Sequence, residues 1–364
     1  MNRTEIPTPA VLIDLDVVDA NISAMVEGTS KYGIAHRPHI KTHKCVALAK
    51  RQAELGCKGI TCAKLGEAEV MAAAGFKDIL IAYPLIGEDK LERLQNLLKQ
   101  DITMRTIVNS VEGAAGISKV GEQLGNPVEI LIEIDGGMDR GGLKPGEPAV
   151  EFARKIKDLP GIKIVGILYF GGGLGKKDSP VNVIEKSLRE RDEIVHTANL
   201  LRAEGHTMDI LSGGSSFTSK NPECLEGLTE VRAGTYIFND VSQLVIGYAR
   251  PENCALTCLV TVISRPDEYS AIIDAGSKTL TSDLNAQRPG YGYVLEDSQI
   301  QIVKLNEEHG FLKSEHRIKF AIGERITIIP NHACVLPNLT DEMFGMRGDE
   351  VEQMLKVDAR GRNR

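Results

Sequence analysis

The first strand that this sequence predicts ends in the stretch RPHIKTHK, residues 37–44. Side chains two residues apart in a strand lie on one face, and here that face is expected to carry Arg37, His39, Lys41 and His43. Four cationic or titratable side chains in a row make a poor core and an unusual surface. They suit the mouth of a barrel, where a desolvated lysine can act as a nucleophile toward an aldehyde. The alternative is a solvated, basic strand end.

Eight apolar, β-branched runs alternate with helical patterns along the first two thirds of the chain. The strand-like runs cover residues 34–41, 59–63, 78–83, 103–108, 128–135, 163–170, 207–213 and 230–238. Helical patterns cover residues 45–55, 65–74, 90–99, 110–123, 149–158 and 182–203, and the last connection, 218–229, is only weakly helical. This strict alternation predicts an α/β protein with a parallel (β/α)8 TIM barrel. A doubly wound sheet is the alternative.

The pattern changes after about residue 240. Strand-like runs at 255–264, 269–274, 299–305 and 325–329 are separated by turn residues without a long helical segment. They predict a smaller, C-terminal antiparallel β domain. We therefore expect the barrel to span residues 16–244 and the β domain to contain residues 1–15 and 245–364. The run at 10–15 could also pair with the barrel, and the basic tail at 360–364 is predicted to be a frayed end.

Composition narrows the class of protein. A net charge of −7 and a pI near 5.7 argue against a general nucleic-acid binder, which needs a basic face. No signal peptide precedes residues 8–10, and no apolar run reaches the length that crosses a bilayer. The seven cysteines are scattered, and Cys254 and Cys258 lack the spacing of a zinc knuckle. We expect a cytoplasmic protein with reduced thiols and no membrane partner.

Polar motifs follow several predicted strands, where the active site of a (β/α)8 barrel lies. Lys41 ends the first strand, MDRG (138–141) follows the fifth, SGGSS (212–216) follows the seventh, and GTY (234–236) lies within the eighth segment. The closely spaced N–H groups and two hydroxyls of residues 212–216 make a cradle suited to a phosphate dianion. An ordinary turn is the alternative.

A lysine that faces a phosphate cradle across a barrel mouth indicates pyridoxal 5′-phosphate, held as a Schiff base on Lys41. Lys41 is therefore the predicted catalytic residue. Arg140 would face the phenolate oxygen of the cofactor, or would form an ordinary salt bridge. The predicted cofactor-binding residues are Lys41, Arg140, Ser212, Gly213, Gly214, Ser215, Gly234, Thr235 and Tyr236.

A second candidate site is the sequence NHAC, residues 331–334. On a strand, His332 and Cys334 would project from one face, so that imidazole and thiolate converge on one metal ion. Sulfur with imidazole favours zinc over magnesium or calcium. Two protein ligands leave open positions for water and substrate, which is a catalytic arrangement. The alternative is a packed histidine beside a buried thiol.

Together these residues resemble the D-threonine aldolase/D-serine dehydratase family, pyridoxal-phosphate enzymes of fold type III with an alanine racemase-like N-terminal domain. The resemblance covers nearly the whole chain. It is carried by TPA (8–10), RPHIKTHK (37–44), GEAE (66–69), ILIAYP (79–84), DGGMDRG (135–141), DAGSK (274–278), EEHG (307–310) and PNHAC (330–334). It implies that Lys41 rather than Lys44 carries the cofactor and that His332 and Cys334 bind a divalent metal, with zinc favoured and manganese or magnesium possible. It also implies a homodimer.

The resemblance implies a lyase that acts on a D-3-hydroxy amino acid. In a dehydratase, Lys41 removes the Cα proton and hydroxide leaves with help from the metal; in an aldolase, the hydroxyl loses its proton and the Cα–Cβ bond breaks. Aldolase-like members usually carry a Y-x-G-H pattern after the sixth strand, where this chain reads LYFGGG (168–173). The missing histidine is the natural base for aldol cleavage, and the cysteine of the metal pair also looks more like the dehydratase side.

Two alternatives to a lyase remain. An amino-acid racemase on the same fold needs a second base, typically a tyrosine from the partner chain, and no metal. A non-catalytic pyridoxal-phosphate carrier is usually a single barrel, so the additional β domain with its metal pair counts against it.

Overall fold

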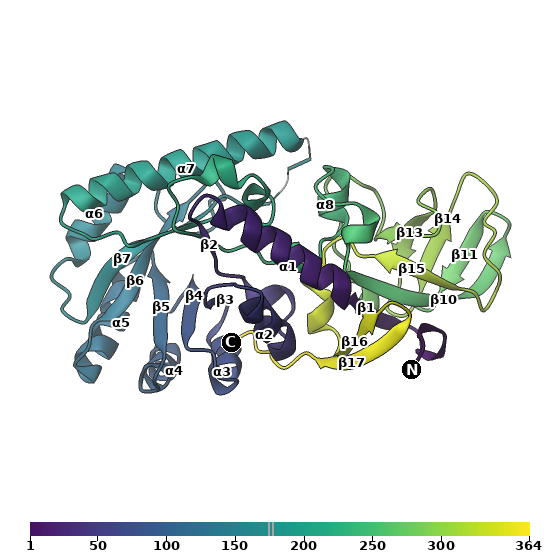
Figure 1. The fold of residues 1–364 in the computed structure, drawn as a ribbon, viewed down its shortest axis with the longest axis horizontal. Helices are drawn as coiled ribbons and strands as arrows, with labels where there is room; N and C mark the ends of the chain where they lie inside the picture. Colours follow the sequence, from purple (N-terminus) through teal and green to yellow (C-terminus); the bar gives the residue numbers. More distant parts are fainter. Residues whose placement is uncertain (174, 177) are drawn as a thin grey trace.

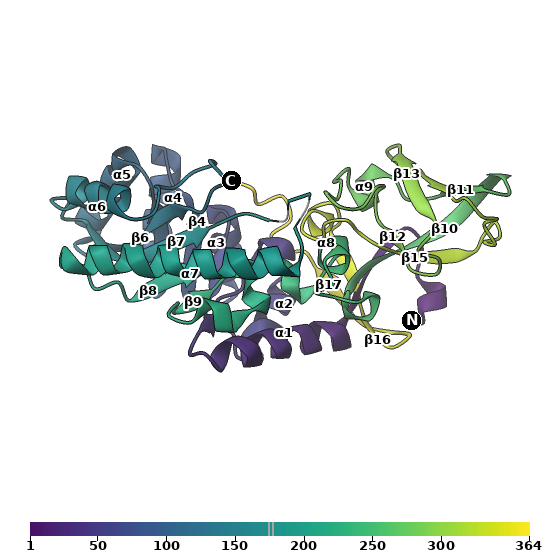
Figure 2. The same cartoon turned by 90° about the horizontal axis from the view of Figure 1, so that it is seen from above.

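A computed structural model describes residues 1–173, 175, 176 and 178–364. In the part described, the chain forms two sheets, each in its own half of the molecule (Figure 1). Helix α1 (Leu15–Ser30) passes between the halves, and the long helix α7 (Pro180–Ala203) covers one side of the first sheet (Figures 1 and 2). None of the described helices combines the length and the apolar character that a bilayer span requires.

The first sheet is the parallel barrel that the alternation of strands and helices predicts. Its order is β2-β9-β8-β7-β6-β5-β4-β3, and every neighbouring pair is parallel. A parallel bridge between His39 and Thr61 joins the two ends of this order and closes the barrel. The strands are β2 (Ala35–His36), β3 (Ile60–Cys62), β4 (Asp78–Pro84), β5 (Thr103–Val108), β6 (Val128–Asp135), β7 (Ile162–Phe170), β8 (Ile210–Gly213) and β9 (Glu230–Val231).

Helices connect these strands on the outside of the barrel. They are α2 (Val46–Glu54), α3 (Leu65–Ala73), α4 (Glu88–Leu98), α5 (Val111–Leu124), α6 (Glu147–Ile156) and α7. Local sequence sets their ends. Ser110 accepts a hydrogen bond from the N–H of Gly113 at the start of α5, and Gly125 ends that helix with a φ of 64°. The predicted connection at 218–229 contains only two short 3-10 turns, Thr218–Lys220 and Pro222–Leu225.

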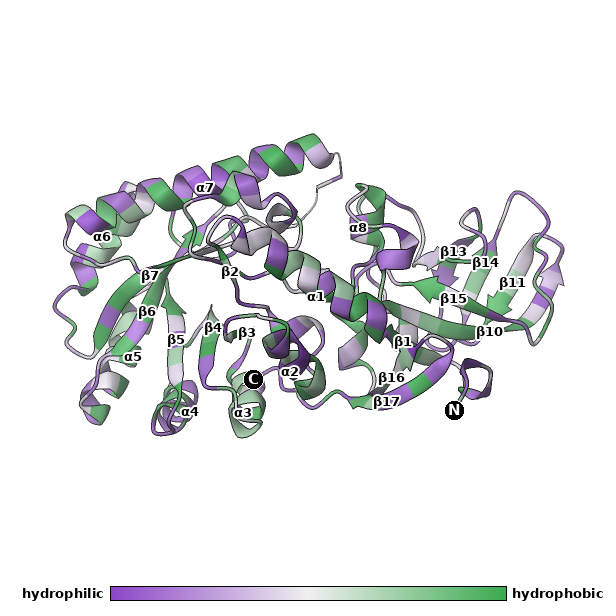
Figure 3. Ribbon diagram, in the orientation of Figure 1, coloured by the Kyte–Doolittle hydropathy of each residue, from purple (hydrophilic) through white to green (hydrophobic). Residues whose placement is uncertain are grey.

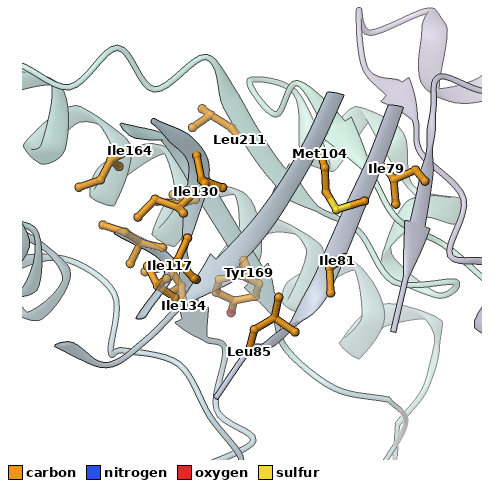
Figure 4. Close-up of a cluster of buried hydrophobic side chains, with 14 of the residues drawn as sticks. Ile79, Ile81, Leu85, Met104, Ile117, Ile130, Ile134, Ile164, Tyr169 and Leu211 are labelled. Atoms are coloured by element: carbon orange, nitrogen blue, oxygen red, sulfur yellow. The ribbon is translucent and has the colours of Figure 1, made fainter. Parts of the chain in front are cut away.

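The period of two along the barrel strands separates two apolar layers. Ile79 and Ile81 of β4 pack in the cluster that includes buried helix residues, while Leu80 between them packs with residues of the other strands. Figure 4 shows part of the helix-facing cluster, with Ile79, Ile81 and Met104 on adjacent strands. In Figure 3 the strands are mostly hydrophobic, whereas α7 alternates between hydrophobic and hydrophilic residues. These patterns are typical of a sheet buried on both faces beneath amphipathic helices.

The second sheet is mostly antiparallel, as predicted. Its order is β13-β14-β11-β10-β1-β16-β17, with β15 paired to β10 and β12. Strand β1 pairs with β10 antiparallel and with β16 parallel, so the 10–15 run joins this sheet and not the barrel. The strands are β1 (Ala10–Asp14), β10 (Leu256–Asp267), β11 (Ser270–Ile273), β12 (Tyr293–Val294), β13 (Gln301–Leu305), β14 (Gly310–Lys313), β15 (Arg325–Ile329), β16 (Glu342–Arg347) and β17 (Glu350–Lys356), with the short helices α8 (Val241–Val245) and α9 (Ser277–Leu280). The domain limits at 15/16 and 244/245 stay predictions.

The prediction that Arg37, His39, Lys41 and His43 share one strand face is wrong. Strand β2 ends at His36, and residues Ile40–Thr42 form a 3-10 turn, so the period of two is lost. Arg37 is buried and bonds Glu230 on the neighbouring strand, with 2.8 Å from Nε to Oε2. His43 is also buried, and its Nε2 lies 3.1 Å from Oε1 of Gln52. The eighth strand is likewise shorter than predicted, so Gly234, Thr235 and Tyr236 follow β9 instead of lying within it.

The prediction that residues 360–364 form a frayed end is also wrong. The tail crosses from β17 to the barrel, and Figure 1 shows the C-terminus beside α2 and α3. The N–H of Gly66, at the start of α3, donates to the carbonyl oxygen of Arg364 at 2.8 Å. The Oδ1 of Asn363 accepts a hydrogen bond from Nζ of Lys44 at 2.6 Å. The tail is therefore anchored although its residues are exposed.

The close packing of α5 against the start of β7 predicts the effect of one methyl group. A Cβ on Gly121 would lie 1.9 Å from the carbonyl oxygen of Gly161, so Gly121→Ala must separate helix and loop. We expect a loss of about 1–3 kcal/mol in the free energy of unfolding, measured with urea. Gly28→Ala in α1 is the control, because nothing lies within 4 Å of its added Cβ; it should stabilise by about 0.5–1 kcal/mol. Equal effects of the two substitutions would contradict this packing.

Candidate active site

A cavity of about 240 Å³ lies where the C-terminal ends of the barrel strands meet the second sheet. It brings together most of the residues predicted from sequence, although they come from distant parts of the chain. Those that line it are Lys41, Gly214, Ser215, Gly234, Thr235, His332 and Cys334. Arg140 lines an adjoining cavity of about 620 Å³, which also contains His39 and Lys41. The guanidinium of Arg140 lies 4.7 Å from the ring centre of Phe170, which lines the smaller cavity.

Lys41 stands between these two cavities. The 3-10 turn that follows β2 carries it, and its side chain has no hydrogen-bond or ion-pair partner among the described residues. Burial and the nearby charges of Lys41 and Arg232 hold the pKa of His39 well below its usual value, so this imidazole is neutral. An amine without an internal partner, next to a neutral histidine, is available to an electrophile.

Two loops on the other side of the cavity are tied together by Ser216. Its hydroxyl oxygen accepts hydrogen bonds from the N–H groups of Gly234 and Tyr236, each at 3.2 Å. The N–H of Ser216 itself and that of Thr235 have no acceptor among the described residues. Free backbone N–H groups at adjoining turns are suited to bind a phosphate group. By contrast, Gly214 N–H already donates to Oε1 of Glu190 at 2.8 Å.

Glycine at position 234 is required by a close approach of the two turns that line the cavity. A Cβ there would lie 2.7 Å from Oγ1 of Thr42 and 3.0 Å from the carbonyl oxygen of His39. The cofactor-binding turn predicted around Gly234 therefore packs directly on the turn that carries Lys41.

Three predicted residues line neither cavity. The hydroxyl of Ser212 is fully buried and lies 2.7 Å both from Oε1 of Glu230 and from a guanidinium nitrogen of Arg232. Gly213 lies in the same buried strand. The phenol oxygen of Tyr236 accepts a hydrogen bond from Gln52 inside the core, and burial raises its pKa. Their assignment to the cofactor stays a prediction.

His332 and Cys334 lie in the turn that follows β15, not on a strand as predicted. Both still line the same cavity, because the turn directs the two side chains toward it. Nδ1 of His332 lies 3.3 Å from Oδ2 of Asp240, which also accepts the N–H of Ala333 at 3.0 Å. A buried carboxylate on Nδ1 leaves Nε2 of the histidine available to a metal ion.

The electrostatics of this pair favour a thiolate beside an imidazolium in the absence of a metal. The adjacent Cys334 raises the pKa of His332 to about 11. Burial opposes ionisation of Cys334, but the charges of His332 and Lys41 outweigh it and lower the thiol pKa to about 7. The hydroxyls of Thr42 and Thr235 lie 3.2 and 3.3 Å from the sulfur. Among the described residues, no three histidine, cysteine or acidic side chains are placed to hold one metal ion together, so a metal bound by this pair would keep open positions.

Several residues of the site were not predicted from sequence. Arg232, Ser216 and Phe217 line the cavity, and Asp240 orients His332. Ser216 belongs to the predicted cradle at 212–216 but was not assigned to the cofactor, and Arg232 lies two residues before the predicted Gly234. Glu230 and Arg232, two residues apart on a predicted strand, could have indicated a buried ion pair. Asp240 lies 92 residues from His332, so no local pattern could have connected them.

Comparison with known proteins gives matches over both halves. The alanine racemase N-terminal domain model matches residues 13–241, and the serine dehydratase domain model matches residues 255–346. D-threo-3-hydroxyaspartate dehydratase of Delftia sp. (strain HT23) is 35% identical over 347 residues, which cover 90% of each chain. The structure of D-threonine aldolase from Filomicrobium marinum matches with a TM-score of 0.89 and 29% identity, over 98% of this chain and 96% of that one.

Two solved variants of D-threo-3-hydroxyaspartate dehydratase are similar as well, each 32% identical. A histidine-to-alanine variant gives a TM-score of 0.91 over 98% of this chain and 96% of that chain. A cysteine-to-alanine variant in the metal-free form gives a TM-score of 0.90 over 98% of this chain and 99% of that chain. The two substituted positions lie two residues apart in that protein, the spacing that separates His332 from Cys334 here.

The low pKa of Cys334 predicts selective alkylation of the metal-free protein. The thiolate is the nucleophile, so the reaction of Cys334 with iodoacetamide should accelerate as pH rises through about 7. Burial raises the pKa of the six other thiols and keeps them protonated at that pH: Cys45, Cys57, Cys62, Cys224, Cys254 and Cys258. Peptide mass mapping measures the labelling, and Cys334→Ser is the control. A midpoint near pH 9, or equal labelling of the other cysteines, would contradict the charge pair.

Proposed function

Because this chain belongs to the family of the alanine racemase N-terminal domain, in its D-threonine aldolase/D-serine dehydratase branch, we propose that it is a lyase for D-3-hydroxy amino acids that uses pyridoxal 5′-phosphate and a divalent metal. The observation that carries the proposal is one cavity that contains an unpaired lysine, free backbone N–H groups and a histidine–cysteine pair. The relatives named above, a dehydratase and an aldolase, act on substrates of this class.

The residues present fit the cofactor. Lys41 would bind its aldehyde carbon, and the N–H groups of Ser216 and Thr235, with the hydroxyls near them, would hold its phosphate. Arg140, in the adjoining cavity, would face the phenolate side. When bound, the cofactor supplies an electron sink that stabilises negative charge at the substrate Cα. The amine of Lys41, which lines the cavity, would be the base that accepts the Cα proton of the substrate.

The histidine–cysteine pair fits a metal ion. A neutral imidazole and a thiolate favour zinc as the bound metal, and manganese and magnesium are the alternative metals. Held there, the ion would supply Lewis acidity at the β-oxygen of the substrate. The metal-free state of the relative's cysteine variant supports this assignment. Asp240 fixes the ring of His332, which keeps its free nitrogen directed at the cavity.

We propose that elimination of water is favoured over aldol cleavage. Aldol cleavage needs a base for the β-hydroxyl, and Phe170, Gly172 and Gly173 line the cavity on the side where the aldolase-like pattern has a histidine. The described lining contains no carboxylate. His39 is a weak base, because burial lowers its pKa. Elimination needs only Lys41 for the Cα proton and the metal for the leaving hydroxide.

We also propose a homodimer in the cytoplasm. The seven cysteines are free thiols, a state that a reducing compartment maintains. The dimer is what the family resemblance implies, and light scattering on the purified protein tests it.

Product analysis tests the reaction. Purified protein loaded with cofactor and zinc is expected to convert D-serine to pyruvate and ammonia and D-threo-3-hydroxyaspartate to oxaloacetate and ammonia. A chelator should abolish both activities, because the β-hydroxyl then has no Lewis acid. Glycine as the main product would overturn the preference for elimination. Conversion of a D-amino acid to its L-enantiomer that survives the chelator would instead support a racemase.

Replacement of Lys41 tests the cofactor site. Lys41→Ala should remove the visible absorbance that added pyridoxal 5′-phosphate gives with the unmodified protein, and should lower activity by about 10³-fold or more. Borohydride reduction followed by peptide mapping should place the modified amine at Lys41. Lys64→Ala is the matched control, since Lys64 lines only the adjoining cavity. Modification of Lys64 or Lys44 instead would contradict the assignment.

A further inference from the structure

We propose that Lys44 is a positioning residue that holds the Lys41 turn in register with the His332–Cys334 turn, an inference that rests on the function proposed above. Its side chain does not line the cavity and is only 6% exposed. The role follows from what its ammonium group contacts.

The ammonium of Lys44 joins three segments that are far apart in the chain. Nζ donates to Oδ1 of Asn363 at 2.6 Å and to Oδ1 of Asn338 at 3.1 Å. It also lies 3.5 Å from Oε1 of Glu67, which is 1% exposed. Burial raises the pKa of Glu67, while the N–H of Ala63 and the ammonium of Lys44 favour its carboxylate form. We refer to Lys44, Glu67, Asn338 and Asn363 as the Lys44 junction.

Each partner belongs to a part of the protein that the active site needs. Glu67 is on α3 of the barrel, and Asn363 is in the docked tail. Asn338 ends the 3-10 turn Leu336–Asn338, four residues after Cys334. Lys44 itself follows Lys41 by three residues. A single buried charge therefore links the turn of the proposed cofactor lysine to the turn of the proposed metal ligands.

The backbone at Lys44 is held by the same tail. Its φ of 51° is left-handed, which a lysine keeps only when surrounding contacts enforce it. The carbonyl oxygen of Lys44 accepts the N–H of Ala359 at 2.9 Å. Asp358 accepts the N–H of Val46 at 2.8 Å, at the start of α2. The tail thus fixes both the conformation and the direction of the chain that leaves the Lys41 turn.

The two turns already touch at one point, since Oγ1 of Thr42 lies 3.2 Å from Sγ of Cys334. That contact is a single hydroxyl–sulfur hydrogen bond between two loops from different sheets. The Lys44 junction supplies the stronger, charged contact beside it. Its loss should therefore weaken binding of the cofactor and of the metal together, even in protein that remains folded.

The test uses the full chain with two variants and a control. Lys44→Met removes the ammonium and keeps the length, and Asn363→Ala removes only the contact from the tail. Lys50→Met is the control, because Lys50 is an exposed lysine of α2 without an ion pair among the described residues. Pyridoxal 5′-phosphate affinity is measured by absorbance titration, and zinc affinity by competition with a chelator. Circular dichroism confirms that each protein is folded at the temperature used.

We expect Lys44→Met to raise the dissociation constant of zinc by about tenfold or more, as for residues that support metal ligands indirectly, and to raise that of the cofactor as well. Asn363→Ala should change both in the same direction by a smaller factor, and Lys50→Met should match the unmodified protein. Because Lys44 and Asn338 share one contact, adding Asn338→Ala to Lys44→Met should cause little further loss of zinc affinity.

Folded Lys44→Met and Asn363→Ala proteins that bind both groups as tightly as the unmodified protein would overturn the inference, even if they melt earlier. If Lys44→Met does not fold, Asn363→Ala and Asn338→Ala decide the question by the same measurements. An unmodified protein that binds neither pyridoxal 5′-phosphate nor zinc would overturn the proposed function, and the inference with it.

Discussion

A network of buried charges next to the cavity is the constraint on which the site depends. Arg37 of the first barrel turn bonds Glu230 of β9, Glu230 bonds the hydroxyl of Ser212 on β8, and Arg232 bonds that hydroxyl and the carbonyl oxygen of Tyr169 on β7. Burial lowers the pKa of Arg232 to about 10 despite the acidic groups around it, and the side chain remains charged at neutral pH. Removing one partner of such a network leaves a buried charge without compensation, which costs about 3–5 kcal/mol.

This network explains why the turns next to it can be irregular. Strands β2 and β9 have only two residues each, and ladder hydrogen bonds alone would hold them weakly. The ion pair between the side chains of Arg37, just after β2, and Glu230 of β9 links the two strands. The chain can therefore leave both strands early, and the turns that follow, at residues 39–42 and 232–235, line the cavity.

Much of the fold could be predicted from sequence, because it depends on local periodicity. Eight apolar runs in alternation with amphipathic helices gave the parallel barrel, and closely spaced strands without helices gave the antiparallel sheet. The errors occurred where tertiary contacts override local pattern. A period of two placed Arg37, His39, Lys41 and His43 together, but the strand ends at His36, and only His39 and Lys41 reach the cavity.

The site was predictable where its residues lie in compact motifs and not where it is assembled over distance. Lys41, Gly214, Thr235, His332 and Cys334 were predicted from motifs, and the structure shows that all five line one cavity. Asp240 and the docked tail could not be found, since their partners lie 92 and more than 290 residues away in the chain. The tail looked frayed because its side chains are polar and exposed, whereas its anchoring uses backbone groups and Asn363.

The place of β1 in the second sheet has a consequence for the order in which the protein folds. Residues 10–14 pair with residues 256–259 on one side and with residues 344–346 on the other. The barrel, in contrast, is complete once residue 231 has been made. During synthesis from the N-terminus, β1 is made first but has no partner strand until β10 and β16 have been made. The barrel strands can thus form on the ribosome, whereas the histidine–cysteine pair and the tail that holds the Lys41 turn are added only as the last tenth of the polypeptide emerges.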